Sequence, residues 1–177
     1  MELTKAIYER RSIRKYKDAE ITREEIEELI KSAQMAPSWK NSQTARFFVA
    51  HSNEYKEKMI DALPSFNKDR AKDASCIIVS AIVKGISGYN ADSEPITHLG
   101  NGFECFDNGL AVENLCLKAY EMGYGTLIMG LYKEQVIREI FNIPDTISIA
   151  TVIAVGKADI SPDTPQRNEL SEILTIK

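Results

Sequence analysis

The segment from Ser75 to Val83 constrains the fold more than any other part of this chain. It reads Ser-Cys-Ile-Ile-Val-Ser-Ala-Ile-Val and is almost continuously apolar. A strand with one face in water alternates apolar and polar residues, whereas a strand that is covered on both faces has no need to alternate. We therefore expect this segment to form a central strand with protein packed on both sides of it.

Weaker signals elsewhere predict an irregular mixture of strands and helices. Two further strands are expected at residues 46–51 and 148–155, and residues 126–129 form a short apolar segment. Five helices are expected. The first is capped by Thr4, the second begins with a capping box of Thr22 and Glu25 and is ended at residue 36 by Pro37, and the third is capped by Asn53 and runs to Leu63. The last two are expected at residues 103–122 and 133–141. Leu3 and Ile7 of the first helix are expected to face inward. The mixture indicates an α+β domain.

The helix expected at residues 103–122 is apolar on more than one side. Such a helix is buried either in a core or in a dimer interface. It follows a polar, glycine-rich segment at residues 84–101 that has no clear period. A loop of this length in a compact domain is more often functional than idle, so we expect a mobile lid or a loop that faces the substrate.

Length and composition favour one globular domain, residues 1–177, in a reducing compartment. The chain has 177 residues, 44% of them hydrophobic, and its three cysteines are too widely spaced to suggest a disulfide framework or a metal site. Charges begin at Glu2, and no stretch approaches the ~20 apolar residues of a membrane span. The sequence thus predicts a cytoplasmic protein with no membrane partner.

The net charge of −4 conceals a basic cluster at residues 1–17, where six basic and two acidic side chains leave a balance of +4. Nucleic-acid binding usually needs a broad basic face, whereas a compact cluster suits one small anion. We therefore expect no nucleic-acid partner.

Common catalytic patterns are missing from the sequence. Gly123, Gly125 and Gly130 have the wrong spacing for a dinucleotide fingerprint, and no Walker A sequence occurs. His51 and His98 are the only histidines, which argues against a metal site and against a hydrolytic triad. An enzyme with this sequence would have to import its reactivity as a cofactor.

One candidate motif is Arg10-Arg11-Ser12-Ile13-Arg14-Lys15-Tyr16. If this stretch is extended, Arg10, Ser12 and Arg14 project to one face. Guanidinium groups can bind two phosphate oxygens at once. The motif therefore predicts either a site for a phosphate or an ordinary solvated basic turn.

A second candidate motif, Ala-Pro-Ser-Trp-Lys-Asn-Ser-Gln, occupies residues 36–43, between a helix and a strand. Ser38, Asn41 and Gln43 offer neutral donors and acceptors, which suit a ligand with several carbonyl and ring-nitrogen atoms. The alternative is an ordinary turn rich in helix breakers.

In this order and spacing, the two motifs together resemble the N-terminal signature of the nitroreductase family of flavoproteins. The resemblance implies that the first motif binds the phosphate of FMN through Arg10, Arg11, Ser12 and Arg14. It implies that the second motif, usually in the partner subunit, touches the flavin through Pro37, Ser38, Trp39, Asn41 and Gln43.

The resemblance continues beyond these two motifs. It implies flavin contacts at Asn67 and Arg70, and backbone amides near flavin N5 within the segment Leu127, Ile128, Met129 and Gly130. A last phosphate contact is implied at Arg167, with Lys157 as a weaker alternative.

The same resemblance implies an α+β fold of the nitroreductase type, with a central mixed β-sheet flanked by helices and the long helix buried at a homodimer interface. It implies FMN as cofactor and NADH or NADPH as electron donor. Hydride would pass through flavin N5 to nitroaromatic, quinone or related acceptors in a ping-pong cycle, without a catalytic side chain or a metal. Two alternatives stay open: a specialised flavin enzyme of the same fold, such as a reductive dehalogenase or a flavin-fragmenting enzyme, and a non-enzymatic protein that binds anions or nucleic acid.

Overall fold

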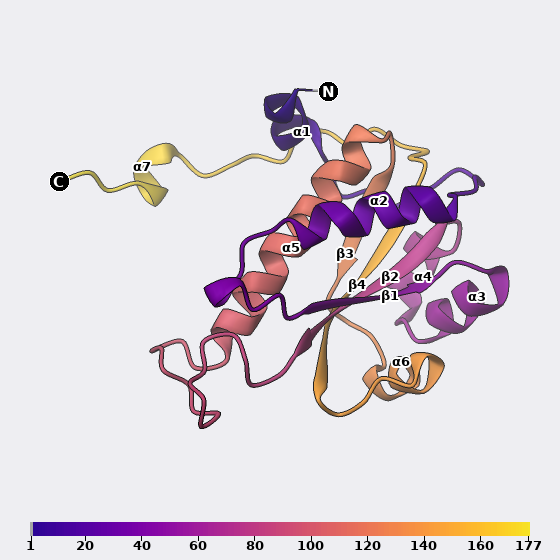
Figure 1. The fold of residues 1–177 in the computed structure, drawn as a ribbon. Coiled ribbons are helices and arrows are strands. Elements are labelled where there is room, and N and C mark those ends of the chain that lie inside the picture. The colour runs from indigo at the N-terminus through magenta and orange to yellow at the C-terminus, as the bar shows by residue number, and fades with distance from the viewer. Residues whose placement is uncertain (1) are drawn as a thin grey trace.

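The computed structural model describes residues 2–177, and Figure 1 shows their arrangement. The strands are β1 (Ala45–Ala50), β2 (Cys76–Val83), β3 (Gly125–Met129) and β4 (Ile147–Gly156). The helices are α1 (Leu3–Glu9), α2 (Arg23–Gln34), the short 3-10 helix η1 (Trp39–Asn41), α3 (Asn53–Asp61), α4 (Ser65–Ala71), α5 (Gly102–Glu121), α6 (Glu134–Phe141) and α7 (Leu170–Ile173). The predicted α+β class is confirmed. Within residues 2–177, no helix has the length and apolar character needed to cross a membrane.

The four strands form one sheet in the order β1-β2-β4-β3, so β2 is central, as its sequence predicts. The sheet is more uniform than the expected mixed sheet, because every neighbouring pair of strands is antiparallel. The connection through α3 and α4 leaves and rejoins the sheet at one end, where Ala50 pairs with Ile77. Among the described residues, the parallel component is a bridge between Ser12 and Thr126.

Helices cover both faces of the sheet, which explains why β2 does not alternate (Figure 1). Ile77 and Val79 of β2 belong to a core that includes residues of α3, α4 and α6. Cys76 and Ile78 point the other way, into a second core with residues of α2 and α5. Full burial of each aliphatic side chain stabilises the fold by roughly 1.5–3 kcal/mol, so both faces of β2 hold the layers together.

A local signal sets the start of α2. The capping box forms as expected: the Glu25 N–H donates to the Thr22 hydroxyl at 3.2 Å, and the Thr22 N–H donates to the Glu25 carboxylate at 2.8 Å. α2 ends at Gln34, slightly earlier than predicted, because the chain turns before Pro37. α5 is the predicted long helix, and its buried residues include the polar side chains Glu104, Asp107 and Asn108.

The prediction for α1 was wrong in its orientation. Leu3 and Ile7 are 67% and 54% exposed, and Ala6 is the buried residue of this helix. α1 is one short helix at the end of the domain and packs on α5 along a narrow side. Its apolar side therefore lies open in the single chain.

The segment after β1 also differs from the prediction. Ser52, rather than Asn53, caps α3, which ends at Asp61. Pro64 then precedes a further helix, α4, that was not predicted. Proline suits the residue before a helix because its missing N–H would have no partner within the helix.

After β4 the chain pairs with the basic segment and then leaves the domain. The Lys17 N–H donates to the Lys157 carbonyl at 2.8 Å, and the Asp159 N–H donates to the Lys15 carbonyl at 3.0 Å. The tail with α7 then extends away from the body (Figure 1). Its apolar side chains are exposed in the single chain, with Ile176 84% exposed.

Candidate functional site

The basic motif at residues 10–16 runs along the open edge of β3. Ser12 forms a bridge with Thr126, and the Ile13 N–H donates to the Thr126 carbonyl at 2.9 Å. Ile13 is buried, and a Cβ atom on Gly125 would lie only 2.8 Å from Ile13 Cβ. Glycine at this position lets the two backbones approach closely, so the motif is held as an extended segment against the sheet.

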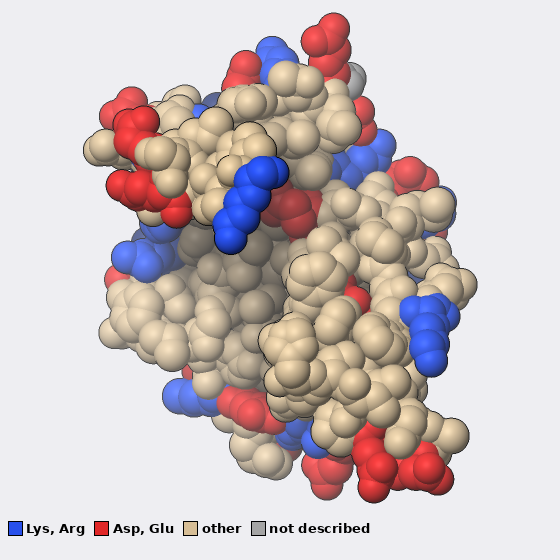
Figure 2. All heavy atoms as spheres, turned by 90° about the vertical axis from the view of Figure 1, so that its left-hand side faces the viewer, with Lys and Arg blue, Asp and Glu red and all other residues tan. Residues whose placement is uncertain are grey.

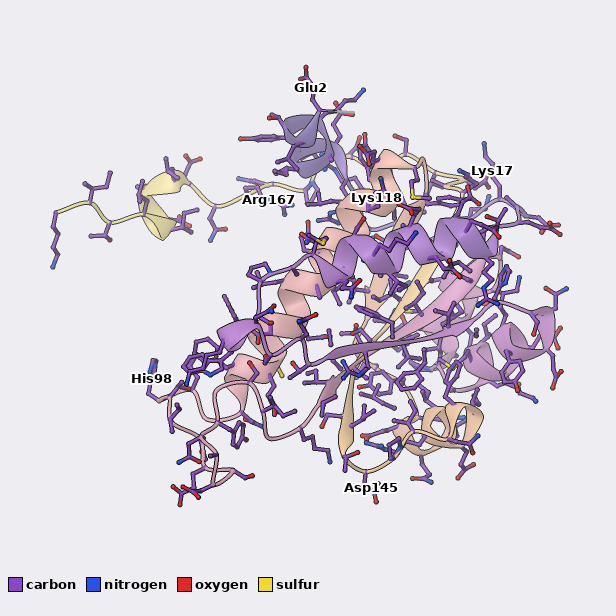
Figure 3. All side chains as sticks on the ribbon, viewed as in Figure 1. Glu2, Lys17, His98, Lys118, Asp145 and Arg167 are labelled. Carbon is purple, nitrogen blue, oxygen red and sulfur yellow. The ribbon has the colours of Figure 1, made fainter. Side chains whose placement is uncertain are left out.

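Side chains of this motif line a pocket of about 280 Å³, called here the arginine pocket. Its lining comprises Arg10, Arg11, Ser12, Arg14, Pro162, Asp163, Pro165 and Arg167. The fold therefore brings the motif together with an arginine from the far end of the chain, which Figure 3 shows on the tail below α1. Four arginines and one aspartate give the pocket a formal charge of +3.

The arginines of the pocket differ in how many of their donors are already hydrogen-bonded to other protein groups. Arg11 donates to two backbone carbonyls and to the Thr164 hydroxyl, which ties the motif to the tail. Arg10 Nε lies 3.3 Å from the Glu113 carboxylate without hydrogen-bond geometry, so this buried N–H has no acceptor among the described residues. Arg14 is exposed and donates to a backbone carbonyl at 3.3 Å. Arg10 and Arg14 thus retain donors for an anion.

Two neighbouring lysines point elsewhere. Lys15 Nζ lies 2.7 Å from the Asp159 carboxylate, and their hydrogen bond and opposite charges raise the pKa of Lys15 and lower that of Asp159. Lys157 Nζ lies 3.5 Å from the centre of the Tyr124 ring and donates to the Met122 carbonyl at 3.3 Å. Of the two tail residues considered for a phosphate, Arg167 lines the pocket and Lys157 does not.

A mostly apolar hollow of about 410 Å³ adjoins the arginine pocket. It is lined by Cys105, Asn108, Gly109, Val112, Glu113, Ile128, Ile149, Ala150 and Thr151. The linings of the two spaces are in contact, since Arg10 of the pocket has its Nε 3.3 Å from the carboxylate of Glu113, which lines the hollow. No sequence pattern marked this hollow, because its residues come from three separate elements, α5, β3 and β4.

Residues of β3 were expected at the site, and they divide between core and hollow. Leu127 and Met129 are buried in the core, whereas Ile128 is 43% exposed and lines the hollow. A Cβ atom on Gly130 would meet nothing within 4 Å, so the backbone just after β3 has open space beside it.

α4 carries the other two residues expected near the flavin. Asn67 is buried, and its Nδ2 lies 3.5 Å from the Leu131 carbonyl, which places this side chain at the end of β3. Arg70 is exposed, and its guanidinium lies 5.5 Å from the centre of the Phe66 ring. The structure therefore brings Asn67 to the end of β3, but it directs Arg70 toward Phe66.

The second motif, residues 36–43, is anchored at the start of α5. The Trp39 N–H donates to the Asp107 carboxylate at 2.8 Å, and the Trp39 ring packs edge-on against Phe103 with ring centres 4.8 Å apart. Positive φ angles of 47°, 55° and 49° occur at Lys40, Asn41 and Gln43. Each such residue costs roughly 1–2 kcal/mol, so the surrounding contacts must hold the loop in this shape.

Within one chain the two motifs stay apart. Asp107, which holds Trp39, and Glu113, beside Arg10, are six residues apart on α5, about 9 Å along the axis and about 120° around it. Pro37, Ser38 and Gln43 line a separate cavity of about 330 Å³ that shares no residue with the arginine pocket. Within the single chain the two motifs therefore line separate cavities.

Neither histidine lies in a metal-binding cluster. His51 Nε2 lies 2.7 Å from the Ile21 carbonyl, and His98 lies in the loop that precedes α5 (Figure 3). Within residues 2–177, no three His, Cys, Asp or Glu side chains are grouped to hold a metal ion.

Comparison with known proteins identifies the family of this chain. A family model described as the nitroreductase family matches residues 7–157. A protein of Archaeoglobus fulgidus, provisionally named as an NADH dehydrogenase/NAD(P)H nitroreductase, is 33% identical over 159 residues, covering 88% of this chain and 84% of that protein.

Solved structures show the same fold. A nitroreductase family protein of Clostridium novyi is 25% identical with a TM-score of 0.77, covering 93% of this chain and 89% of that one. A provisionally named nitroreductase of Exiguobacterium sibiricum, solved in complex with FMN, is 24% identical with a TM-score of 0.86, covering 100% and 98%. Since the family model spans both motifs and the whole sheet, this chain belongs to the nitroreductase family.

Proposed function

We propose that this chain is an FMN-dependent oxidoreductase that uses NADH or NADPH to reduce nitroaromatic, quinone or related acceptors. The observation that carries the proposal is the gathering of Arg10, Ser12, Arg14 and Arg167 around one pocket, beside an apolar hollow. FMN joins an anionic phosphate to a flat aromatic ring, so its two ends suit these adjoining spaces. The name of the Archaeoglobus relative and the FMN in the Exiguobacterium structure support this cofactor and this electron donor.

The residues of the arginine pocket fit a phosphate. The buried Arg10 N–H that has no acceptor would gain one, and Arg14 and Arg167 would each present a guanidinium fork. A charge-assisted hydrogen bond contributes about 1.5–3 kcal/mol, whereas micromolar affinity needs about 8 kcal/mol. Immobilising the ligand costs several kcal/mol more. Three such bonds are therefore not enough, and burial of the flavin ring in the hollow would supply the balance.

The ring end of FMN would lie against the hollow and the end of β3. Ile128 and Ile149 offer apolar side chains there, and Gly109 leaves open space. The backbone amides of residues 129 and 130 would face flavin N5, and Asn67 would serve the pyrimidine edge or the ribityl chain. When bound, FMN supplies the hydride chemistry, while the chain's own residues bind the cofactor, orient it and offset its charge.

We propose further that a second copy of the chain completes the site. The loop at residues 36–43 is remote from the arginine pocket of its own chain, and a two-fold partner could present that loop to its neighbour's pocket. In Figure 2, the hollow on the face shown is lined by uncharged residues, while a basic side chain crosses its upper edge with acidic atoms beside it. α1, α5 and the tail expose Leu3, Ile7, Phe106 and Ile173. A second subunit packed on these elements would bury apolar side chains that are exposed in the single chain.

The proposed reaction can be followed in the visible spectrum of protein reconstituted with FMN. Under anaerobic conditions, NADH or NADPH is expected to bleach the flavin bands, and a quinone or nitroaromatic acceptor is expected to restore them. Recovery with halogenated aromatics alone would favour a reductive dehalogenase, and irreversible loss of the bands would favour flavin fragmentation. No bleaching by either nucleotide would contradict the reductase proposal.

A further inference from the structure

Asp107 lies where two loops meet the start of α5. Its side chain is buried, and Oδ2 accepts hydrogen bonds from the Trp39 N–H at 2.8 Å and from the Ser87 hydroxyl. Trp39 belongs to the loop at residues 36–43, which we propose touches the flavin. Ser87 is fully buried in the loop at residues 84–101, which we expect to face the acceptor. One carboxylate oxygen thus joins both loops.

The loop at residues 84–101 is also pressed against the first turns of α5. The Gly85 N–H donates to the Glu104 carboxylate at 2.5 Å. Gly88 has a φ of 83°, and a Cβ atom there would lie 3.0 Å from Phe103 Cβ. Because Phe103 also packs against the Trp39 ring, a second line of contact runs from this loop to the loop at residues 36–43.

The loop at residues 36–43 depends on support from outside itself. Its own hydrogen bonds include one from the Gln43 N–H to the Ser38 hydroxyl at 3.0 Å. Trp39 Nε1 is buried and has no acceptor among the described residues, so no hydrogen bond from the indole orients the ring. The orientation of Trp39 therefore depends on the Asp107 bond to its backbone and on Phe103 beside its ring.

We propose that Asp107 is a positioning residue that couples the two loops. The conformation of the loop at residues 84–101 then sets the orientation of the loop at residues 36–43, and this orientation in turn sets the affinity for FMN. A carboxylate suits this role because it accepts from both donors on one oxygen and carries no competing donor. The last step rests on the proposed function, whereas the coupling between the loops is a property of the chain with or without flavin.

Trp39 is the only tryptophan of the chain, so a fluorinated tryptophan reports on this loop alone. We suggest 19F NMR of protein labelled with 5-fluorotryptophan, comparing wild type with Ser87→Ala and Asp107→Asn. The matched control is Ser75→Ala, because Ser75 is also buried and donates its hydroxyl to the Ala19 carbonyl at 2.6 Å. Ser87→Ala removes the contact of the loop at residues 84–101 with Asp107, and it is expected to shift or broaden the Trp39 resonance of the loop at residues 36–43. Asp107→Asn is expected to shift it in the same direction, and Ser75→Ala is expected to leave it in place.

A Trp39 resonance unchanged in Ser87→Ala, or changed equally in Ser75→Ala, would overturn the coupling. The second experiment measures the FMN affinity of the same proteins by titration. Ser87→Ala is expected to weaken FMN binding roughly fivefold, which corresponds to about 1 kcal/mol. Ser75→Ala is expected to leave the affinity unchanged. If the wild type fails to bind FMN while Ser87→Ala still shifts the resonance, the proposed function fails and the coupling stands. If the wild type binds FMN and Ser87→Ala binds equally well, the effect of the coupling on the cofactor is refuted.

Discussion

Replacing Arg14 by glutamate should abolish FMN binding and leave the fold intact. Arg14 is exposed, lines the arginine pocket and makes a single long hydrogen bond to a backbone carbonyl. The substitution removes a charged contact of about 1.5–3 kcal/mol. It also places a carboxylate about 6 Å from a phosphate that carries a charge of about −1.5 to −2, which adds about 2–3 kcal/mol at an effective dielectric of about 40. The sum, about 3.5–6 kcal/mol, corresponds to a loss of affinity between about 300-fold and about 20,000-fold, by roughly 1.4 kcal/mol per tenfold.

The assay is calorimetric titration of flavin-free protein with FMN, together with thermal melting followed by circular dichroism. Lys15→Glu is the matched control, because it makes the same change of charge one residue along, at a side chain that pairs with Asp159 and lies outside the pocket lining. Its FMN affinity should stay within about threefold of wild type, as an exposed ion pair contributes little. If Arg14→Glu binds FMN within about tenfold of wild type, or if Lys15→Glu loses as much affinity, the assignment of the phosphate pocket is refuted.

Three further predictions test the composite site, the packing of the basic motif and the burial of the cysteines. When Arg14→Glu chains are mixed with Asn41→Ala/Gln43→Ala chains, random pairing makes about half of the dimers mixed, and one of the two sites in each mixed dimer carries neither defect. About a quarter of all flavin sites should therefore bind FMN again. No recovery would contradict a site shared between two chains. Gly125→Ala should lower the free energy of unfolding by about 1–3 kcal/mol, because the added Cβ would meet the side chain of Ile13. Gly109→Ala is the control and should not lower it, because a Cβ there would meet nothing within 4 Å. Equal melting temperatures for the two variants would refute the close approach of Gly125 to Ile13. Burial raises the pKa of the Cys76 thiol to about 12 and also raises the pKa of the Cys116 thiol, and the thiolate is the reactive form of cysteine. At neutral pH a thiol reagent should therefore modify only the exposed Cys105, and the other two should react only at higher pH or after unfolding. Rapid labelling of all three thiols in the native protein would contradict the burial of Cys76 and Cys116.

Strong local signals made parts of the fold predictable from sequence. The apolar run of β2 predicted burial on both faces, and the capping box predicted the start of α2, since each signal is contained in a few adjacent residues. α4 escaped prediction because it is short and buries only Asn67 and Ala71, which leaves almost no periodic pattern. The inward orientation of Leu3 and Ile7 was wrong because periodicity shows that a helix has an apolar side, not whether the same chain covers it.

The candidate site was predictable where residues lie close in sequence and less so where tertiary structure decides. The basic motif is contiguous in the sequence, but only the structure shows that Arg167 lines the arginine pocket while Lys157 turns to the Tyr124 ring. The hollow beside β3 could not be predicted, because its lining combines ordinary residues of three elements. The separation of the two motifs by α5 is likewise a property of packing, and it makes a second subunit part of the proposal.

The visible absorption spectrum of the purified protein after titration with FMN tests the central claim most directly. We predict that the protein retains FMN through gel filtration, shows the bands of a bound oxidised flavin, and saturates at one flavin per chain. Protein that stays colourless after incubation with excess FMN, while keeping its native melting transition, would contradict the account.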